Sequence, residues 1–185
     1  MVVDCATEWR DTWEVTQGNG GPRGHSHLTH LARALAEVAA SDGVERLVEV
    51  LPSAARYLAR SDAATFVLRD GDQCHYVAED AMSPLWAGQR FPMTDCVSGW
   101  VMLHGEPAAI ENIYADHRVP ADAYRPTFVS SMAMVPIRSR DPLGAIGAYW
   151  ADQHAPTANE ISLLSSLAEA AAVALDRQAV ATLTA

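Results

Sequence analysis

Apolar residues near the start of the chain recur with a helical period. Between residues 28 and 38, Leu and Val positions lie three or four apart, which places them on one face of a helix. Asp42-Gly43-Val44-Glu45 has the spacing of a capping box. It predicts a second helix that runs to about Leu58, with Pro52 bending or splitting it.

From Ala63 the pattern changes to that of β-strands. Asp70-Gly71 lies between two apolar runs, and this dipeptide is typical of a hairpin turn because glycine accepts a positive φ. A turn-rich link at 138–142 is short enough to make its flanking segments antiparallel, central strands. Gly144 and Gly147 suggest that a helix or a ligand approaches the backbone closely. Five strands are expected, at residues 64–68, 73–78, 108–112, 132–137 and 143–151.

Two more helices are expected in the second half of the chain. Ser98 is in position to cap a short helix that reaches His104 and ends at Gly105. A capping box at 157–160 opens a long helix rich in Ala and Leu. Residues 113–131 predict a structured loop with one or two helical turns near 122–129. The buried stripe of the long helix is expected at Ile161, Leu164, Ala168, Ala171 and Leu175.

These elements predict an α+β fold with an antiparallel sheet of five to six strands. The N- and C-terminal helices should cover one face of the sheet. The other face is left to the irregular segment at residues 82–131. Since loops and short helices cover a sheet without filling it, a small-molecule pocket is expected there.

Length and composition indicate one domain. The chain has 185 residues, of which 49% are hydrophobic and 19% charged, enough to bury one core. Residues 1–26 contain a run of glycines with a proline and predict a flexible leader. Residues 27–178 form the expected domain, and 179–185 the tail of its last helix.

Charge and cysteine usage exclude several classes of function. A net charge of −10 disfavours nucleic acids and anionic lipid surfaces as partners. We see neither a run of about 20 apolar residues nor a signal peptide, so we expect a cytoplasmic protein. The three cysteines, Cys5, Cys74 and Cys96, contain no Cys-x-x-Cys pair, so no disulfide framework or zinc site is expected.

Several ordered blocks of the sequence resemble GAF domains of bacterial sensor proteins. Leu-Trp-Ala-Gly-Gln-Arg-Phe-Pro at 85–92 and Cys-Val-Ser-Gly-Trp at 96–100 resemble the middle of that domain. Residues 160–175 resemble the C-terminal helix that leads into an output module. The similarity covers 28–178, and several blocks in order are more specific than one motif. Further blocks lie at 110–120, 124–128, 134–138 and 142–150.

The nearest resemblance is to GAF domains placed ahead of histidine kinases of the HWE class and related two-component sensors. It implies a non-catalytic sensory domain that binds a small molecule and signals through its terminal helices to an attached or partner output module, such as a histidine kinase. The apolar stripes of those helices predict a parallel homodimer. The ligand, any cofactor and the output module stay open.

The candidate ligand-binding residues are aromatic and polar side chains of the pocket segment. Rings of Tyr and Trp stack on flat ligands while keeping a polar atom. Arg125 and Asp116 either complement a charged ligand or pair with each other. The predicted set is Trp86, Cys96, Trp100, Tyr114, Asp116, Tyr124, Arg125 and Phe128.

Cys96 and two histidines have alternative interpretations. Cys96 is a redox-sensing thiol, a covalent attachment point or a small buried residue, and adjacent Asp95 does not favour a thiolate. Bilin-binding relatives usually carry a Cys-His pair where this chain has Ala123-Tyr124-Arg125-Pro126. His104 and His117 are structural or haem-binding, and no second ligand lies at i+3 or i+4, so no metal site is expected.

An enzyme and a ligand-free dimerisation module are the alternatives to a sensor. One GAF branch reduces free methionine sulfoxide with thiols that converge. Cys74 and Cys96 are the candidates for such a pair here, although their sequence context differs from that branch. No Ser-His-Asp arrangement or phosphate-binding glycine loop is recognised, which favours a non-enzymatic domain.

Overall fold

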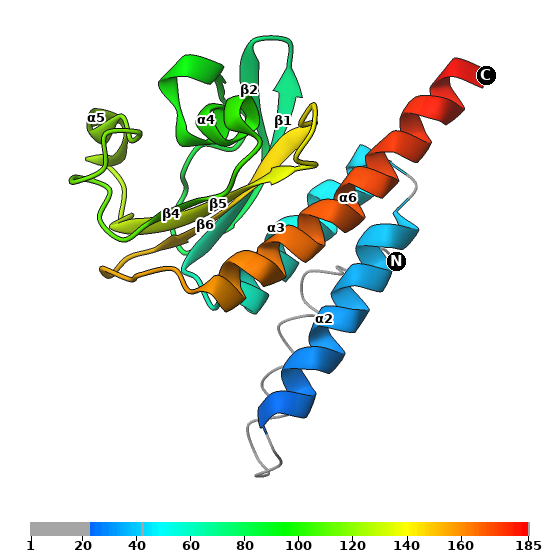
Figure 1. The fold of residues 1–185 in the computed structure, drawn as a ribbon, viewed down its shortest axis with the longest axis horizontal. Coiled ribbons are helices and arrows are strands. Elements are labelled where there is room, and N and C mark those ends of the chain that lie inside the picture. Colours follow the sequence, from blue (N-terminus) through cyan, green and yellow to red (C-terminus); the bar gives the residue numbers. More distant parts are fainter. Residues whose placement is uncertain (1–22, 42, 185) are drawn as a thin grey trace.

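A six-stranded antiparallel sheet lies at the centre of the chain (Figure 1). The structure is a computed structural model and describes residues 23–41 and 43–184. Cys5 and most of the predicted leader lie outside the described residues. The strand order is β3-β2-β1-β6-β5-β4, so the predicted antiparallel sheet is confirmed. The strands are β1 (Ala63–Asp70), β2 (Gln73–Ala81), β3 (Arg90–Pro92), β4 (Ala108–Ile110), β5 (Ser131–Ile137) and β6 (Gly144–Trp150).

The β1–β2 hairpin forms where the sequence predicts it. Asp70 pairs with Gln73 across a two-residue turn, and Gly71 has a φ of 63°. Gly71 alone, and not Asp70, supplies the positive φ of this turn. β3 is the strand that the sequence pattern misses, because three residues are too few to show a period of two.

The long helices α3 and α6 cover one face of the sheet, the long helix α2 packs on α3 and α6, and short helices lie over the other face (Figure 1). α2 begins four residues inside the predicted leader, and α5 is shorter and begins earlier than the expected turns at 122–129. The long helices are α2 (Arg23–Ala40), α3 (Val44–Ala59) and α6 (Ala158–Thr184). The short ones are α4 (Val97–His104), α5 (Ala121–Tyr124) and the 3-10 helix η2 (Met93–Asp95).

The helix ends confirm one predicted cap and correct two. The Thr157 hydroxyl accepts the Glu160 backbone N–H at 3.2 Å, and a Glu160 carboxylate oxygen accepts the Thr157 N–H at 2.7 Å, which is the capping box expected for α6. α3 instead begins after Gly43, which has no side chain for capping. α4 begins after Cys96, so Ser98 lies inside the helix rather than at its cap.

Pro52 neither splits nor ends α3. The helix continues from Val44 to Ala59 with Pro52 inside it. Proline lacks a backbone N–H and normally interrupts a helix interior. Here the neighbouring Ser53 hydroxyl donates to the Val50 carbonyl oxygen at 3.2 Å, and α3 packs its buried side against the sheet.

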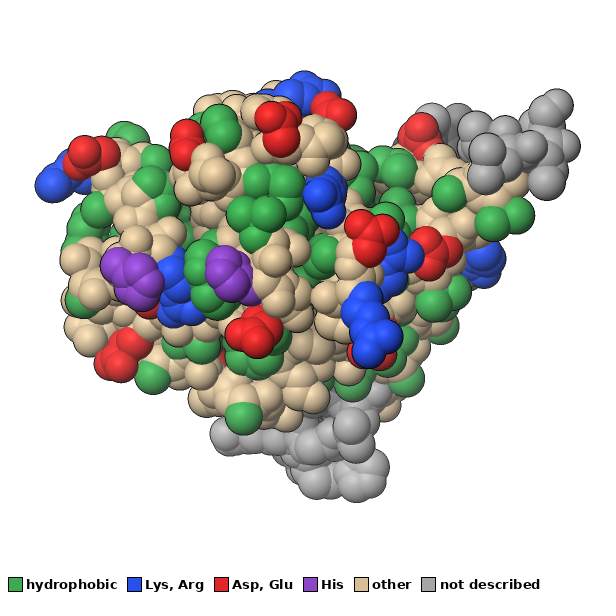
Figure 2. Space-filling view, turned by 45° about the horizontal axis from the view of Figure 1, so that its top comes forward, with side chains coloured by type: hydrophobic (Ala, Val, Ile, Leu, Met, Phe, Trp, Pro, Cys, Tyr) green, Lys and Arg blue, Asp and Glu red, His purple; other side chains and the backbone are tan. Residues whose placement is uncertain are grey.

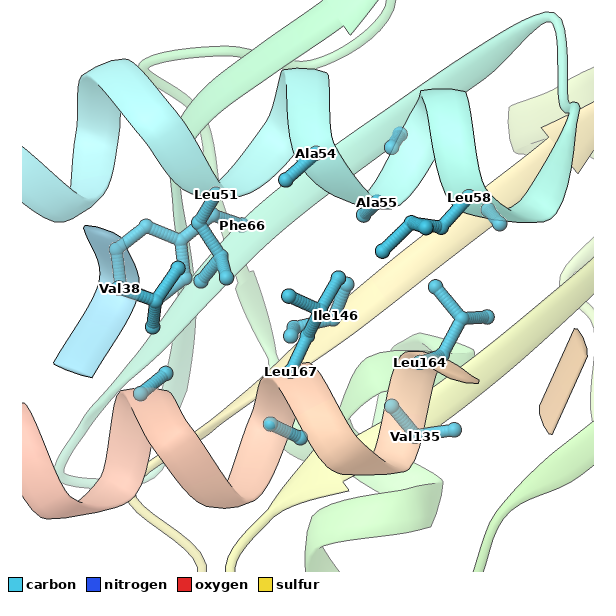
Figure 3. Close-up of a cluster of buried hydrophobic side chains, with 14 of the residues drawn as sticks. Val38, Leu51, Ala54, Ala55, Leu58, Phe66, Val135, Ile146, Leu164 and Leu167 are labelled. Atoms are coloured by element: carbon cyan, nitrogen blue, oxygen red, sulfur yellow. The ribbon is translucent and has the colours of Figure 1, made fainter. Parts of the chain in front are cut away.

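The helical core is the buried cluster between the sheet and α2, α3 and α6 (Figure 3). Leu51 and Leu58 of α3 face Phe66 and Ile146 of the sheet in this view. Its members are almost all aliphatic. They include Val38, Leu51, Ala55, Leu58, Phe66, Val135, Ile146, Leu164 and Leu167.

The aromatic core is the buried cluster on the opposite face, under α4, α5 and the segment before β3. It contains the rings of Tyr76, Trp86, Tyr124 and Tyr149. Strands β1, β2, β5 and β6 supply both cores, because successive side chains point to opposite faces. Core members on this face include Val67, Cys74, Tyr76, Trp86, Cys96, Tyr124, Met132, Met134 and Tyr149.

The predicted close approach at the β6 glycines comes from the protein's own strands. A Cβ on Gly144 would meet the Val67 carbonyl oxygen at 2.1 Å. A Cβ on Gly147 would meet the Tyr149 hydroxyl at 2.6 Å and the Thr65 hydroxyl at 2.8 Å. Gly147 therefore makes room for the ring of Tyr149, rather than for a helix or a ligand.

Surface charge and the hydropathy of α6 are the two properties that concern nucleic acids and membranes as partners. On the face shown in Figure 2, acidic and basic side chains are interspersed with hydrophobic ones. Ala158–Ala181 of α6 has a mean hydropathy of 1.2 and is long enough to cross a membrane by length and composition, a run that the sequence analysis does not recognise. A helix that packs in a core meets the same criterion, and Leu164 and Leu167 of α6 lie in the helical core.

Candidate functional site

One carboxylate fastens the segment before β3 to the sheet. Glu79 of β2 accepts backbone N–H groups from Leu85 at 2.8 Å, Trp86 at 2.8 Å and Ala87 at 2.9 Å. The Gly88 N–H also donates to the Tyr76 carbonyl oxygen at 2.7 Å. Three N–H groups that converge on an anion form a favourable, charge-assisted arrangement. Glu79 therefore holds Trp86 over the aromatic core.

Trp86 packs edge-on against three tyrosines. Its ring centroid lies 4.9 Å from that of Tyr124, 5.6 Å from Tyr149 and 5.7 Å from Tyr76. Such tilted contacts are favourable because the positive edge of one ring meets the negative face of another. The sequence pattern predicts that Trp86 and Tyr124 line an open pocket. The structure instead packs the two rings against each other in the core.

Hydroxyl groups form pairs inside the aromatic core. The Tyr149 and Thr65 hydroxyls lie 3.0 Å apart, and so do the Tyr76 and Ser98 hydroxyls. Burial raises the pKa of Tyr76 and of Tyr149, because it removes the water that would stabilise a phenolate. Both tyrosines are therefore neutral, and each hydroxyl can donate or accept.

Tyr124 is the buried tyrosine with the weakest partner. Its side chain is 3% exposed, and its hydroxyl donates to the Met132 sulfur at 4.0 Å. A thioether is a weak acceptor, and a buried donor without a good acceptor costs stability. Burial also raises the pKa of Tyr124. The Tyr124 hydroxyl is therefore a neutral donor available to an incoming acceptor.

Cys96 has a different electrostatic setting from the one its sequence indicates. The hydrogen bond from the Cys74 thiol, followed by one from the Ser98 hydroxyl, lowers the pKa of Cys96 to about 7 against the opposing effect of burial. Asp95 does raise this pKa, as expected, but its effect is smaller. The pKa of Cys74 is raised, first by its hydrogen bond to Cys96 and then by burial. Cys96 is thus the sulfur of the pair that ionises first.

Trp100 and Asp116 belong to a surface cluster that fixes the loop after β4. The Arg118 guanidinium lies 4.8 Å from the Trp100 ring centroid, and His104 stacks on the same ring at 4.3 Å. Asp116 accepts from Arg118 Nε at 2.9 Å and Nη2 at 2.6 Å. This bidentate pair lowers the pKa of Asp116 and raises that of Arg118.

The remaining predicted residues differ in how far their side chains are exposed to solvent. Phe128 is partly buried and packs against the aromatic core. Tyr114 is 55% exposed, and Arg125 is exposed and pairs with Asp122 at 2.8 Å. The interpretation that Arg125 and Asp116 pair with each other is wrong, because each has an acidic or basic partner two or three residues away. The eight predicted residues therefore do not share one pocket.

A shallow hollow of about 370 Å³ lies beside the end of β4, and Asp116 is its one member from the predicted set. It is also lined by Ile110, Glu111, Asn112 and Gln153. Within 23–41 and 43–184, no three His, Cys, Asp or Glu side chains gather as possible metal ligands. His104 is engaged with Trp100, whose carbonyl oxygen lies 2.8 Å from its Nδ1.

The strand residues of the aromatic core are those that the sequence analysis misses. Thr65, Tyr76 and Tyr149 lie on β1, β2 and β6, outside the irregular segment where a site is expected. A signal does exist for two of them. Thr65 and Tyr149 carry hydroxyl groups among otherwise apolar residues at 63–68 and 144–150, and inward polar positions in a buried strand need a partner.

A family profile described as GAF domain matches residues 41–176 of the chain. No curated protein sequence matches it. Among solved structures, the GAF domain of a phosphoenolpyruvate-protein phosphotransferase from Coxiella burnetii has 16% identity and a TM-score of 0.74, over 88% of this chain and 99% of that one.

Two other solved structures show how widely this fold is shared. A free methionine-R-sulfoxide reductase from Neisseria meningitidis, in complex with its substrate, has 16% identity and a TM-score of 0.73, over 88% of this chain and 96% of that one. The chromophore-binding domain of a bacteriophytochrome from R. palustris has 12% identity and a TM-score of 0.73, over 89% of this chain and 64% of that one. At these identities the similarity shows the fold.

Proposed function

The chain belongs to the GAF domain family, and from that premise we propose that it is a sensory domain that binds a small molecule in the aromatic core. It acts without catalysing a reaction. Occupancy of the core changes the packing of α2 and α6, which transmit the signal to an attached or partner output module such as a histidine kinase of a two-component system.

The observation that carries this proposal is the set of polar groups inside the aromatic core. Ligand sites are mostly apolar, with a few placed donors and acceptors. Four buried rings supply the apolar walls here, and hydroxyls of Thr65, Ser98 and the tyrosines supply the polar atoms. The Tyr124 hydroxyl favours a ligand that carries an acceptor, such as a carbonyl or carboxylate oxygen, because its present acceptor is a sulfur at 4.0 Å.

Trp86 is the side chain that must move to admit a ligand. It lies in a segment without helix or strand between β2 and β3, which is held to β2 by the three N–H bonds to Glu79 and by the Gly88 N–H bond to the Tyr76 carbonyl oxygen. A flat ligand that replaces the Trp86 ring would regain contact with Tyr76, Tyr124 and Tyr149. The exchange of one ring for another keeps the core filled.

β5 is the element that connects a bound ligand to the terminal helices. Met132 and Met134 of this strand lie in the aromatic core, and Ala133 and Val135 lie in the helical core. Figure 3 shows Val135 next to Leu164 of α6. A ligand that displaces the methionines would shift the strand against α6, provided that it binds the two packings unequally.

The terminal helices are also the proposed dimer interface. Val173 and Val180 of α6 are 55% and 61% exposed, on the part of the helix that reaches toward the chain end. Burial against the same helices of a second copy would remove this apolar surface from water. We expect a homodimer in the cytoplasm.

Native mass spectrometry of the purified full chain tests this proposal. The expected spectrum is a dimer that carries a small molecule, released on denaturation. Tyr124→Phe should reduce the fraction of chains with a ligand, because it removes the donor. Tyr114→Phe is the matched control and should leave that fraction unchanged, since Tyr114 is exposed. A monomer without a ligand would contradict the proposal, and a dimer without one would favour the dimerisation module.

A thiol-dependent enzyme is the second candidate function, and the interaction of Cys74 with Cys96 favours it. The reductase from Neisseria meningitidis with a similar structure acts on free methionine sulfoxide. The purified chain would be assayed with free methionine sulfoxide and a dithiol reductant. Turnover that is lost in Cys96→Ser would replace the sensory proposal with the enzymatic one.

A further inference from the structure

The turn after β3 brings together two cysteines that are far apart in the sequence. Cys74 lies on β2 and pairs with Phe91 of β3 in the ladder. The Met93 backbone N–H then donates to the Asp72 carbonyl oxygen at 2.9 Å, which holds the start of η2 next to the hairpin. The chain reverses through η2 and enters α4 at Cys96, so that Cys96 returns to the face on which Cys74 lies.

The two thiols are neighbours on the face that carries Ser98. The Cys96 side chain contacts Pro92, which follows the Phe91 that pairs with Cys74, and the interaction between the two thiols shifts their pKa values in opposite directions. The Cys96 sulfur lies 3.1 Å from the Ser98 hydroxyl oxygen, and as a thiol it donates to the Pro92 carbonyl oxygen at 3.5 Å. Cys74 is 0% exposed and Cys96 is 8% exposed. Cys96 is thus the sulfur that a small solute reaches first.

The pair is asymmetric in a way that suits stepwise oxidation. The interaction with Cys74 and the hydroxyl of Ser98 lower the pKa of Cys96, so Cys96 forms a thiolate more readily than an ordinary cysteine. The pKa of Cys74 is raised, so it stays a thiol. A thiolate with a thiol beside it is the usual arrangement of a nucleophilic and a resolving cysteine.

We infer that Cys74 and Cys96 form a reversible intramolecular disulfide when Cys96 reacts with a peroxide. The Cys96 sulfur attacks one peroxide oxygen; an S–O bond forms, the O–O bond breaks, and the other oxygen leaves as water. The Cys74 sulfur then gives up its proton and attacks the Cys96 sulfur, and the sulfenic hydroxyl leaves as a second water. Two thiols and one hydrogen peroxide give one disulfide and two waters.

The disulfide would join the start of α4 to β2. In the reduced protein, α4 packs on β5 and β6 and its Ser98 hydroxyl binds Tyr76. The covalent link would act on β2, the strand from which Glu79 also binds the backbone of Trp86. This inference concerns the oxidation state of the core and holds whether or not a ligand binds there.

The test uses the full chain with Cys5→Ser, which leaves Cys74 and Cys96 as the two thiols. The protein is exposed to hydrogen peroxide, blocked with N-ethylmaleimide after denaturation and weighed. We expect a loss of about 2 Da and no maleimide adduct. Trypsin cleaves after arginine, so the link should join peptides 70–90 and 91–118, and dithiothreitol should separate them.

Two further variants of the Cys5→Ser protein test whether Cys96 is oxidised first and Cys74 then forms the disulfide. Cys74→Ser should stop the reaction at a sulfenic acid on Cys96 that dimedone traps, and Cys96→Ser should leave Cys74 as an unreacted thiol. The inference is overturned if both thiols survive a peroxide dose that oxidises free cysteine. It is also overturned if the link joins two chains, or if Cys96 becomes a sulfinic acid while Cys74 stays reduced.

Discussion

The two faces of the sheet are built from the same strands but hold different chemistry. The helical core contains aliphatic side chains and few polar atoms, and it is closed by three long helices. The aromatic core contains tyrosines, methionines, two thiols and buried hydroxyls, and it is closed by short helices and an irregular segment. Aliphatic packing stabilises the fold without a preferred contact geometry. Ring contacts and hydrogen bonds of hydroxyl groups are favourable only in particular orientations. This contrast places most of the folding free energy on one face, and it is the basis for proposing that the other face recognises a ligand.

The largest effect should come from emptying the helical core. Phe66 is fully buried there, and Phe66→Ala should lower the free energy of unfolding by about 3–5 kcal/mol, through lost burial and the cavity left behind. Urea denaturation followed by circular dichroism measures the loss. Met82→Ala, at an exposed position, is the control and should stay within about 0.5 kcal/mol. A loss below about 1 kcal/mol at Phe66 would remove the assignment of stability to this face.

A second substitution tests how closely α4 packs against η2 on the aromatic face. A Cβ on Gly99 would lie 1.9 Å from the Met93 carbonyl oxygen, and a backbone atom cannot turn away as a side chain does. Gly99→Ala should therefore cost about 1–3 kcal/mol, although alanine favours helices. The same denaturation experiment measures it, with exposed Leu103→Ala of α4 as the matched control. A stabilised Gly99→Ala protein would show that α4 and η2 pack loosely.

A third comparison distinguishes a tyrosine hydroxyl that has a good hydrogen-bond partner in the aromatic core from one that has a weak partner. Tyr149→Phe removes a hydrogen bond to Thr65 at 3.0 Å and should cost about 0.5–1.5 kcal/mol. Tyr124→Phe removes a contact to sulfur at 4.0 Å and should change stability by less than about 0.5 kcal/mol. Equal losses in the two variants would mean that the Tyr124 hydroxyl has a stronger partner, and would weaken its proposed role as a ligand donor.

The smallest effect is expected at the surface cluster. Asp116→Asn breaks the pair with Arg118 and should cost at most about 1 kcal/mol at pH 7, because both side chains are partly solvated. Arg118 lowers the pKa of Asp116, so this stability is present above the usual carboxylate pKa of about 4 and is lost as pH falls through the lowered value. Thermal unfolding of both proteins at several pH values checks this. A difference that grows on acidification would contradict it.

Tyr124 and Trp100 show why the site was harder to predict than the fold. Both lie in the segment that the sequence assigns to a pocket, yet Tyr124 is a core ring and Trp100 contacts His104 and Arg118. Replacing Tyr124 with alanine, which a pocket wall would tolerate, should therefore destabilise the domain as core truncations do. Whether an aromatic residue lines a cavity or fills it depends on neighbours that sequence spacing does not reveal.

The sequence by itself determined most of the elements and their order, with β3 as the strand that it missed. The period of apolar residues located α2, the change of pattern at Ala63 located the strands of the hairpin, and the Thr157–Glu160 box located the start of α6, because these signals act between residues that are close in the chain. Only the tertiary structure decided that Cys74 lies next to Cys96, that Trp86 packs against three tyrosines, and that Asp116 forms its ion pair with Arg118 rather than with Arg125. These contacts depend on how far a three-residue strand and a short 3-10 helix turn the chain, and such geometry leaves no period in the sequence.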